Sequence, residues 1–161
     1  MKNVLRFWFE KGVAGFRVDA IAHLFEVDKA KFDGKYPDEP RNPGNNDPES
    51  YDYVDHIYTK DQDETYDMVY QWREIFDEYS EKDGLKRVMM TEVYASPQVT
   101  MRYFGDGERE GSHMPFNFVL ISDVNGESSA AEIKYALDKF LTFKPVDKHA
   151  NWVVSRNVQY I

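Results

Sequence analysis

The sequence has 161 residues, and its apolar content of 42% is enough for one hydrophobic core. Its formal net charge of −9 argues against a nucleic-acid partner and against binding to anionic membrane surfaces. The absence of cysteine excludes disulfide bonds and thiol chemistry within this sequence. We expect no signal peptide at Met1–Leu5 and no membrane segment, because no apolar run is long enough to span a bilayer.

The pattern of apolar residues predicts an alternation of helices and strands. In chain order the segments are a helix over 2–11, a strand around Asp19, a long polar loop over 27–62, a helix over 64–80, a strand ending at Glu92, a weak helix over 96–104, a strand over 115–121, a helix that starts at Ser129 and stops at Lys144-Pro145, and a strand beginning at Asn151. This order is typical of a parallel α/β sheet.

The helical spacing also predicts which faces are buried. The inward residues are Val4, Leu5 and Trp8 in the first helix, Met68, Val69, Trp72, Ile75, Phe76 and Tyr79 in the second, and Ile133, Ala136, Leu137, Phe140 and Leu141 in the last. Ser129 and Glu132 have the spacing of a capping box. The loop contains four tyrosines, which predicts that it is ordered and packed despite its length: Tyr36, Tyr51, Tyr53 and Tyr58.

Two of the predicted strands end in a carboxylate. In Gly15–His23, Arg17 and Asp19 share one side of the strand, and an adjacent guanidinium stabilises an ionised carboxylate. Asp19 could therefore be a nucleophile, or it could form a structural Arg–Asp pair at a strand end. Glu92 ends the next apolar strand. Two such carboxylates suit glycoside hydrolysis, in which a retaining enzyme holds its pair about 5–5.5 Å apart.

The amino-acid sequence of these stretches resembles the α-amylase family of glycoside hydrolases. Gly15–His23 is similar to its second signature region and Thr91–Ala95 to its third, and within the family the sequence is most similar to insect maltases. The similarity extends to three further stretches: Pro37–Asn42, Met114–Phe118 and Asn151–Val153. The resemblance implies a (β/α)8 barrel, of which this sequence supplies strands four to seven. We therefore expect 1–161 to be a fragment of one catalytic domain, with 27–62 as the loop after its first strand.

The resemblance also implies the roles of single residues. Asp19 is the expected nucleophile, Glu92 the general acid and then the base, and Arg17 a substrate-binding residue beside the nucleophile. Alanine at position 20, directly after the expected nucleophile, resembles the residue found there in family members that act on α-1,4 linkages. The implied function is a maltase-like α-glucosidase acting on maltose, sucrose and short oligosaccharides, in a protein that is secreted or anchored outside the cell.

No cofactor is required for this chemistry, but the resemblance implies a structural calcium ion. His23, Leu24 and Glu26 match positions that supply calcium ligands in some family members, partly through backbone carbonyls. The alternative for His23 is a packed, hydrogen-bonded histidine without a metal.

The sequence departs from the family at its end. The family continues from its seventh strand as Asn-Trp-Val-x-Gly-Asn-His-Asp, whereas here 155–161 form a divergent tail that lacks the sugar-binding His and Asp. We expect the isolated chain to be inactive and marginally stable, with open sheet edges at the Asp19 and Trp152 strands. Two other functions stay open. One is a non-catalytic maltase-like subunit or receptor, similar to the heavy chains of amino-acid transporters, and the other is a half-barrel that binds sugar without hydrolysing it.

Overall fold

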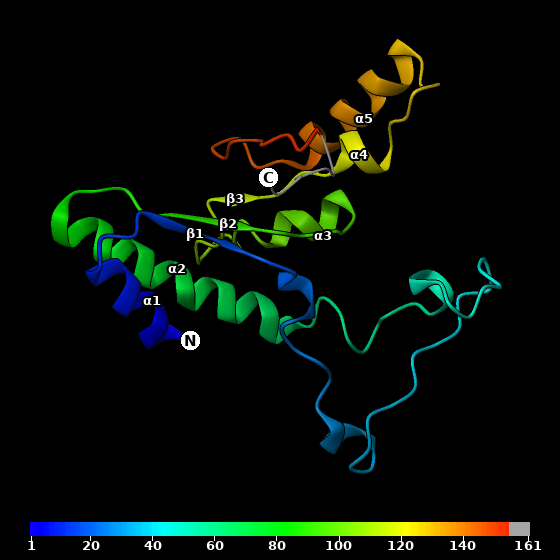
Figure 1. Cartoon of the computed structure of the whole chain (residues 1–161), viewed down its shortest axis with the longest axis horizontal. Helices are drawn as coiled ribbons and strands as arrows, with labels where there is room; N and C mark the ends of the chain where they lie inside the picture. Colours follow the sequence, from blue (N-terminus) through cyan, green and yellow to red (C-terminus); the bar gives the residue numbers. More distant parts are fainter. Residues whose placement is uncertain (155–161) are drawn as a thin grey trace, which may run out of the picture.

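A computed structural model describes residues 1–154 of the chain. Its centre is a parallel sheet in the order β1-β2-β3, formed by β1 (Gly15–Val18), β2 (Val88–Thr91) and β3 (Met114–Pro115) (Figure 1). Within residues 1–154 the outer strands β1 and β3 each pair on one side only. The predicted α/β class is confirmed, but the sheet has three strands in this part of the chain where four were expected.

Five α-helices accompany the sheet in residues 1–154. They are α1 (Lys2–Glu10), α2 (Asp63–Asp83), α3 (Pro97–Arg102), α4 (Val119–Ser122) and α5 (Ala130–Phe143). In Figure 1, α1 and α2 lie on one side of the sheet, and α4 and α5 lie on the other. Along the part of the chain that is described, no helix has both the length and the apolar character needed to cross a bilayer.

The core lies between α1, α2 and the sheet. α2 buries the predicted stripe, and it ends at Gly84, whose φ of 73° suits glycine best. The helix α1 is confirmed, and Leu5 is buried as predicted, but the predicted inward positions of Val4 and Trp8 are wrong, since each is 46% exposed. Phe9 is buried beside Leu5. The Phe9 ring makes edge contact with the Phe76 ring of α2 at 4.9 Å between centroids, and this contact sets the rotation of the helix.

Close packing of β1 on β2 requires glycine at one position. Gly15 is paired with Val88, and a Cβ atom at Gly15 would lie 2.3 Å from the Val88 carbonyl oxygen. No side chain, however small, fits there without separating the two backbones.

The predicted strand over 115–121 is wrong beyond its first residues. Pairing ends where the Phe116 N–H donates to the Thr91 carbonyl at 2.8 Å. The Asn117 side-chain oxygen then accepts a hydrogen bond from the Val119 N–H at 3.1 Å, and α4 begins directly afterwards. A local side-chain acceptor thus turns the backbone from a strand into a helix.

The last part of the described chain follows the prediction only in part. The capping box of Ser129 and Glu132 is present at the start of α5. This helix buries Ala136 and Phe140 as predicted. The predicted inward position of Leu141 is wrong, since that residue is 45% exposed. Residues 151–154 form no strand. The Asn151 side chain accepts from the Asn117 N–H, and the Val153 N–H donates to the Asn117 carbonyl, which is too little for a ladder. The predicted tail at 155–161 lies outside the described residues.

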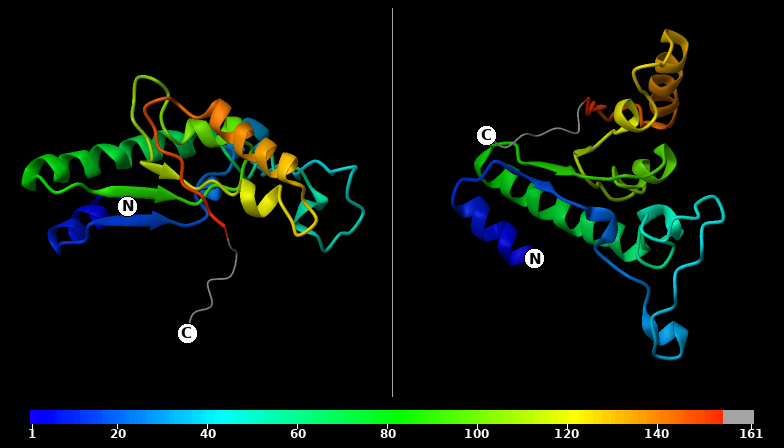
Figure 2. Two further views of the ribbon diagram at one scale, coloured as in Figure 1. Left: turned by 90° about the horizontal axis from the view of Figure 1, so that it is seen from above. Right: turned by 45° about the vertical axis from the view of Figure 1, so that its right-hand side comes forward.

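The long loop projects from the sheet and returns to it (Figures 1 and 2). It contains the short 3₁₀ helices η2 (Lys29–Phe32) and η3 (Tyr51–Tyr53), and it follows η1 (Ile21–His23). Its two arms are joined by an antiparallel bridge between Arg41 and Val54, and the Val27 N–H donates to the Tyr58 carbonyl at 2.9 Å. Side chains add to these backbone contacts, since the Tyr58 ring packs against Phe32 and the Tyr51 ring stacks on His56, although Tyr36 and Tyr51 are exposed.

The Gly15 contact predicts a large effect of a single methyl group. We expect Gly15→Ala to lower the free energy of unfolding by about 1–3 kcal/mol, because β1 must move away from β2. Gly126→Ala is the matched control, since a Cβ atom there meets nothing within 4 Å. Urea unfolding followed by circular dichroism measures both. Equal midpoints for the two variants would contradict the close approach.

His113 predicts a pH dependence of stability. Its Nδ1 accepts from the Met89 N–H at 3.1 Å, and burial, followed by the Arg73 charge, lowers its pKa from 6.5 to about 4. The folded chain therefore holds His113 neutral while the unfolded chain protonates it. Stability from this group is complete above pH 6.5 and is lost as the pH falls toward about 4, by on the order of 1–2 kcal/mol after allowance for partial exposure.

His113→Asn keeps a side-chain acceptor and removes this titration. We expect its unfolding midpoint in urea to change less between pH 6.5 and 4 than that of the wild-type chain. His149→Asn, at an exposed histidine, serves as the control and should keep the wild-type pH slope. A wild-type slope in His113→Asn would rule out this role.

Candidate active site

The candidate site lies where β1 and β2 end. In the parallel register Val18 is paired with Thr91, so Asp19 and Glu92 both follow directly at the same edge of the sheet. The Glu92 N–H donates to the Val18 carbonyl at 2.8 Å, which continues the ladder by one step. The backbone alone therefore places the two predicted carboxylates side by side.

Arg17 joins the two carboxylates. Its Nη2 atom lies 2.7 Å from Asp19 Oδ1 and 2.9 Å from Glu92 Oε1. Because one nitrogen contacts both oxygens, these oxygens can be no farther apart than the two distances together. The two carboxylates are therefore near neighbours, as the pair of a retaining glycosidase must be. Arg17 also lies over the Phe116 ring, 5.7 Å from its centroid.

The two carboxylates differ in their exposure and in their partners. The Asp19 side chain is 71% exposed, whereas that of Glu92 is 18% exposed. Glu92 uses its second oxygen, Oε2, to accept a hydrogen bond from the Ala20 N–H at 3.1 Å. Asp19 is thus open to an incoming ligand, while Glu92 is held from two directions.

Ala20 is the residue that sequence reasoning missed in this role. Its φ of 46° and ψ of 37° place it in the left-handed region, where a non-glycine residue costs about 1–2 kcal/mol. The turn aims the Ala20 N–H at Glu92 and leads into η1. Nothing in the sequence announces it, since alanine has no preference for this conformation.

His23, one of the residues predicted to hold calcium, has other hydrogen-bond partners in this structure. His23 donates from Nδ1 to the Thr59 carbonyl at 3.1 Å, and its Nε2 lies 3.2 Å from the Tyr51 hydroxyl. Both ring nitrogens are therefore engaged, although His23, Leu24 and Glu26 are all exposed. In residues 1–154 no three acidic or histidine side chains come close enough to hold a metal ion. Calcium binding through backbone carbonyls stays a prediction.

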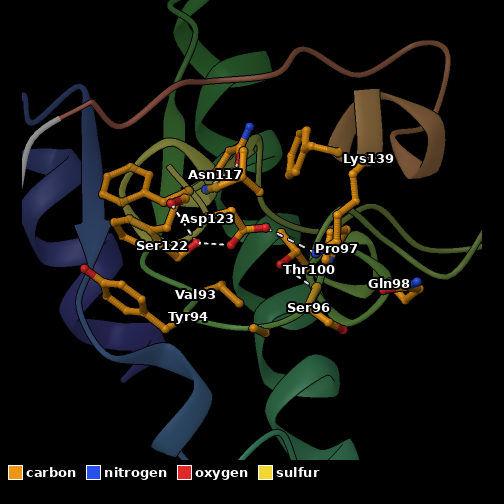
Figure 3. A pocket seen from close by; sticks show the side chains of 15 residues that line it. Val93, Tyr94, Ser96, Pro97, Gln98, Thr100, Asn117, Ser122, Asp123 and Lys139 are labelled. Carbon is orange, nitrogen blue, oxygen red and sulfur yellow. Dashed lines mark hydrogen bonds and ion pairs between the residues drawn. The ribbon is translucent and has the colours of Figure 1, made fainter. Parts of the chain in front are cut away.

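A cavity of about 480 Å³ lies between α3, α4 and α5. Its lining includes Val93 and Tyr94, the two residues that follow Glu92 in the sequence. Its aromatic wall includes Tyr94 and Phe118, whose rings are stacked at 3.8 Å between centroids. In Figure 3, the Asp123 side chain lies at its centre, between Ser122 and Lys139. Aromatic surface beside a few converging polar groups is typical of a small-molecule site.

The polar group in this cavity is an ion pair supported by a hydroxyl. Ser122 Oγ donates to Asp123 Oδ1 at 2.7 Å, and Lys139 Nζ lies 3.2 Å from Asp123 Oδ2. The Ser122 hydrogen bond first, and then Lys139, lower the pKa of Asp123. The carboxylate is therefore ionised at neutral pH and can accept further hydrogen bonds. Sequence reasoning missed this cavity, because its residues come from three separate helices and their connections.

Comparison with known proteins identifies the family. The model of the alpha amylase catalytic domain matches residues 1–159. The chain therefore belongs to the alpha-amylase catalytic domain family, as the motifs around Asp19 and Glu92 predicted.

Individual relatives are similar over almost the whole chain. Maltase A1 from Drosophila melanogaster is 48% identical over 161 residues, and a salivary alpha-glucosidase from Aedes aegypti is 45% identical over 157 residues. Each alignment covers 98% of this chain, but only 28% and 27% of the respective relative. The chain thus spans less than a third of the length of these relatives.

Two further similarities bear on fold and function. The crystal structure of the alpha-glucosyl transfer enzyme XgtA matches with a TM-score of 0.73 and 25% sequence identity, over 96% of this chain and 27% of that one. The amino acid transporter heavy chain SLC3A1 from Homo sapiens is 30% identical over 159 residues, covering 96% of this chain and 22% of that protein.

The left-handed conformation of Ala20 predicts an asymmetric response to substitution. Ala20→Val should lower the free energy of unfolding by about 1–2 kcal/mol or more, because a β-branched residue tolerates positive φ poorly. Ala20→Gly should change it by less than about 1 kcal/mol, since relief of strain offsets the greater freedom of the unfolded chain. Urea unfolding of both variants is the measurement. A Val variant as stable as the Gly variant would contradict the strained turn.

Proposed function

We propose that this chain carries the nucleophile and the acid/base residue of a retaining α-glucosidase. Its substrates are maltose, sucrose and short oligosaccharides, from which it releases terminal α-1,4-linked glucose. The observation that carries the proposal is the contact of one Arg17 nitrogen with both Asp19 and Glu92. Similarity to proteins named maltase and alpha-glucosidase supports it.

The proposed cycle has two steps that balance without a cofactor. Asp19 attacks the anomeric carbon and forms an ester, while the bond to the leaving oxygen breaks and that oxygen takes a proton from Glu92. A water molecule then gives a proton to Glu92. The oxygen of that water bonds to the anomeric carbon as the ester bond to Asp19 breaks. The exposed position of Asp19 suits attack, and the restrained position of Glu92 suits directed proton transfer.

Arg17 supports this cycle because the negative charge alternates between its two partners. Before attack Asp19 is the anion and Glu92 carries the proton. After attack Asp19 is an uncharged ester and Glu92 is the anion. At each stage one carboxylate charge lies beside one guanidinium, so the cation need not move far to offset it.

The remaining assignments follow from the same proposal. We place β1, β2 and β3 as the fourth to sixth strands of an eight-stranded barrel within one catalytic domain, with 27–62 as the loop after β1. Ala20 supports α-1,4 specificity, and the relatives named salivary support secretion of the whole protein.

The non-catalytic alternative is not favoured. The transporter heavy chain is 30% identical to this chain, compared with 48% for maltase A1. Both candidate catalytic carboxylates and their shared arginine are present here and in contact, as a hydrolase requires.

The proposal predicts a single covalent labelling event. A glucose-shaped cyclitol epoxide should esterify Asp19 slowly, one label per chain, as detected by mass spectrometry of the labelled peptide.

We expect turnover of an aryl α-glucoside to be orders of magnitude below that of a maltase, because the family's sugar-binding His and Asp are absent from 151–161.

Asp19→Asn should abolish the labelling and Glu92→Gln should slow it, whereas Asp38→Asn, at an exposed loop residue, should leave it unchanged. The proposal is wrong if Asp19→Asn is labelled at the wild-type rate, or if the label resides outside Gly15–His23.

A further inference from the structure

The end of the long loop is bound to the backbone that follows both carboxylates. Residues 59–61, named here the tie segment, make a contact at every position. The Thr59 carbonyl accepts from His23 Nδ1 at 3.1 Å, and Lys60 Nζ donates to the Tyr94 carbonyl at 2.6 Å. The Asp61 N–H donates to the Ala22 carbonyl at 2.8 Å.

These partners lie in the segments that follow two different strands, β1 and β2. Ala22 lies three residues after Asp19, and Tyr94 lies two residues after Glu92. The tie segment therefore joins the turn after β1 to the turn after β2, on the side where the two carboxylates meet. A fourth contact fixes the segment itself, since the buried Tyr103 hydroxyl donates to Asp61 Oδ1 at 2.7 Å.

One carboxylate from the far arm of the loop holds the start of this segment. Glu39 Oε1 accepts from the Thr59 N–H at 2.8 Å, from the Thr59 hydroxyl at 2.7 Å and from the Tyr58 N–H at 3.0 Å. Glu39 Oε2 also lies 3.1 Å from the Tyr58 nitrogen. Hydrogen bonds to an ionised acceptor are roughly twice as strong as neutral ones, so this side chain is the main anchor of the loop's returning arm.

We propose that Glu39 and Lys60 are positioning residues for the catalytic pair. Glu39 holds residues 58–59 in place. Lys60 then bonds to the turn after Glu92, and the Asp61 N–H bonds to the turn after Asp19, so both turns are restrained by the same segment. The importance of this restraint for catalysis rests on the proposed function. Neither side chain needs to touch the substrate.

The hydrogen bond between the Ala20 N–H and Glu92 Oε2 offers a reporter that does not depend on turnover. If the tie segment fixes the two turns relative to each other, weakening it should expose this amide. Glu39→Gln removes the charge and leaves one acceptor oxygen, while Lys60→Met keeps the aliphatic stem and removes the donor to Tyr94. We expect Ala20 amide exchange to become roughly three- to tenfold faster in both variants, as measured by NMR hydrogen exchange.

Glu49→Gln is the matched control, because Glu49 is an exposed glutamate of the same loop, and it should keep the wild-type exchange rate at Ala20. The Phe76 amide in the core of α2 should be unchanged in all three variants, which separates the effect from global destabilisation. Faster exchange confined to Tyr58 and Thr59, with Ala20 unchanged, would show a role limited to the loop and overturn the proposal. Should Glu39→Gln fail to fold, Lys60→Met decides the question alone.

Labelling by the cyclitol epoxide separates this inference from the proposed function. At saturating reagent, Glu39→Gln and Lys60→Met should label Asp19 more slowly than Glu49→Gln, with little change in the concentration that gives half the maximal rate. A wild-type chain that takes no label refutes the α-glucosidase assignment, while the exchange experiment still decides whether the tie segment positions the two turns.

Discussion

The parallel pairing of β1 with β2 brings two carboxylates to one nitrogen atom of Arg17, and the candidate site depends on that contact. Two carboxylates that contact the same atom repel each other whenever both are ionised, and solvent screening weakens that repulsion. A cation between them removes the reason for either side chain to turn away. The parallel register determines where the two side chains lie, since it places Asp19 and Glu92 at the same height at the sheet edge. Charge and backbone pairing thus specify the same arrangement.

Sequence reasoning was accurate where one local pattern decides the outcome. The stripe of apolar residues in α2, the capping box of α5 and the strands ending before Asp19 and Glu92 were all found in this way. Each depends on residues near one another in the chain, so tertiary contacts had little to overrule. The family motifs added the identity of the chain, which composition and periodicity could not supply.

The features that sequence reasoning missed were decided by particular contacts that periodicity does not show. Phe9 meets the α2 aromatic rings and rotates α1, so that Trp8 faces outward. Asn117 replaces a further ladder bond with its own side chain and ends β3 early. Ala20 adopts its turn because Glu92, 72 positions away, accepts its N–H. The partners of Phe9 and Ala20 are far away in the sequence, and that of Asn117 is only two residues on, but the apolar pattern indicates none of these contacts.

The closure of the long loop has a consequence for how its length can change. Closing a flexible loop costs conformational entropy that grows only with the logarithm of its length, about 0.6 kcal/mol for each doubling. The arms are already joined at Val27 and Tyr58 and again at Glu39, so residues beyond the Arg41–Val54 bridge form a separate small ring. The ring touches the base of the loop through Tyr51, whose hydroxyl lies 3.2 Å from His23 Nε2, so insertions or deletions that keep this contact should leave the contacts of 59–61 intact. The tip of the loop is therefore free to vary in sequence and size, while its base is constrained by the site it adjoins.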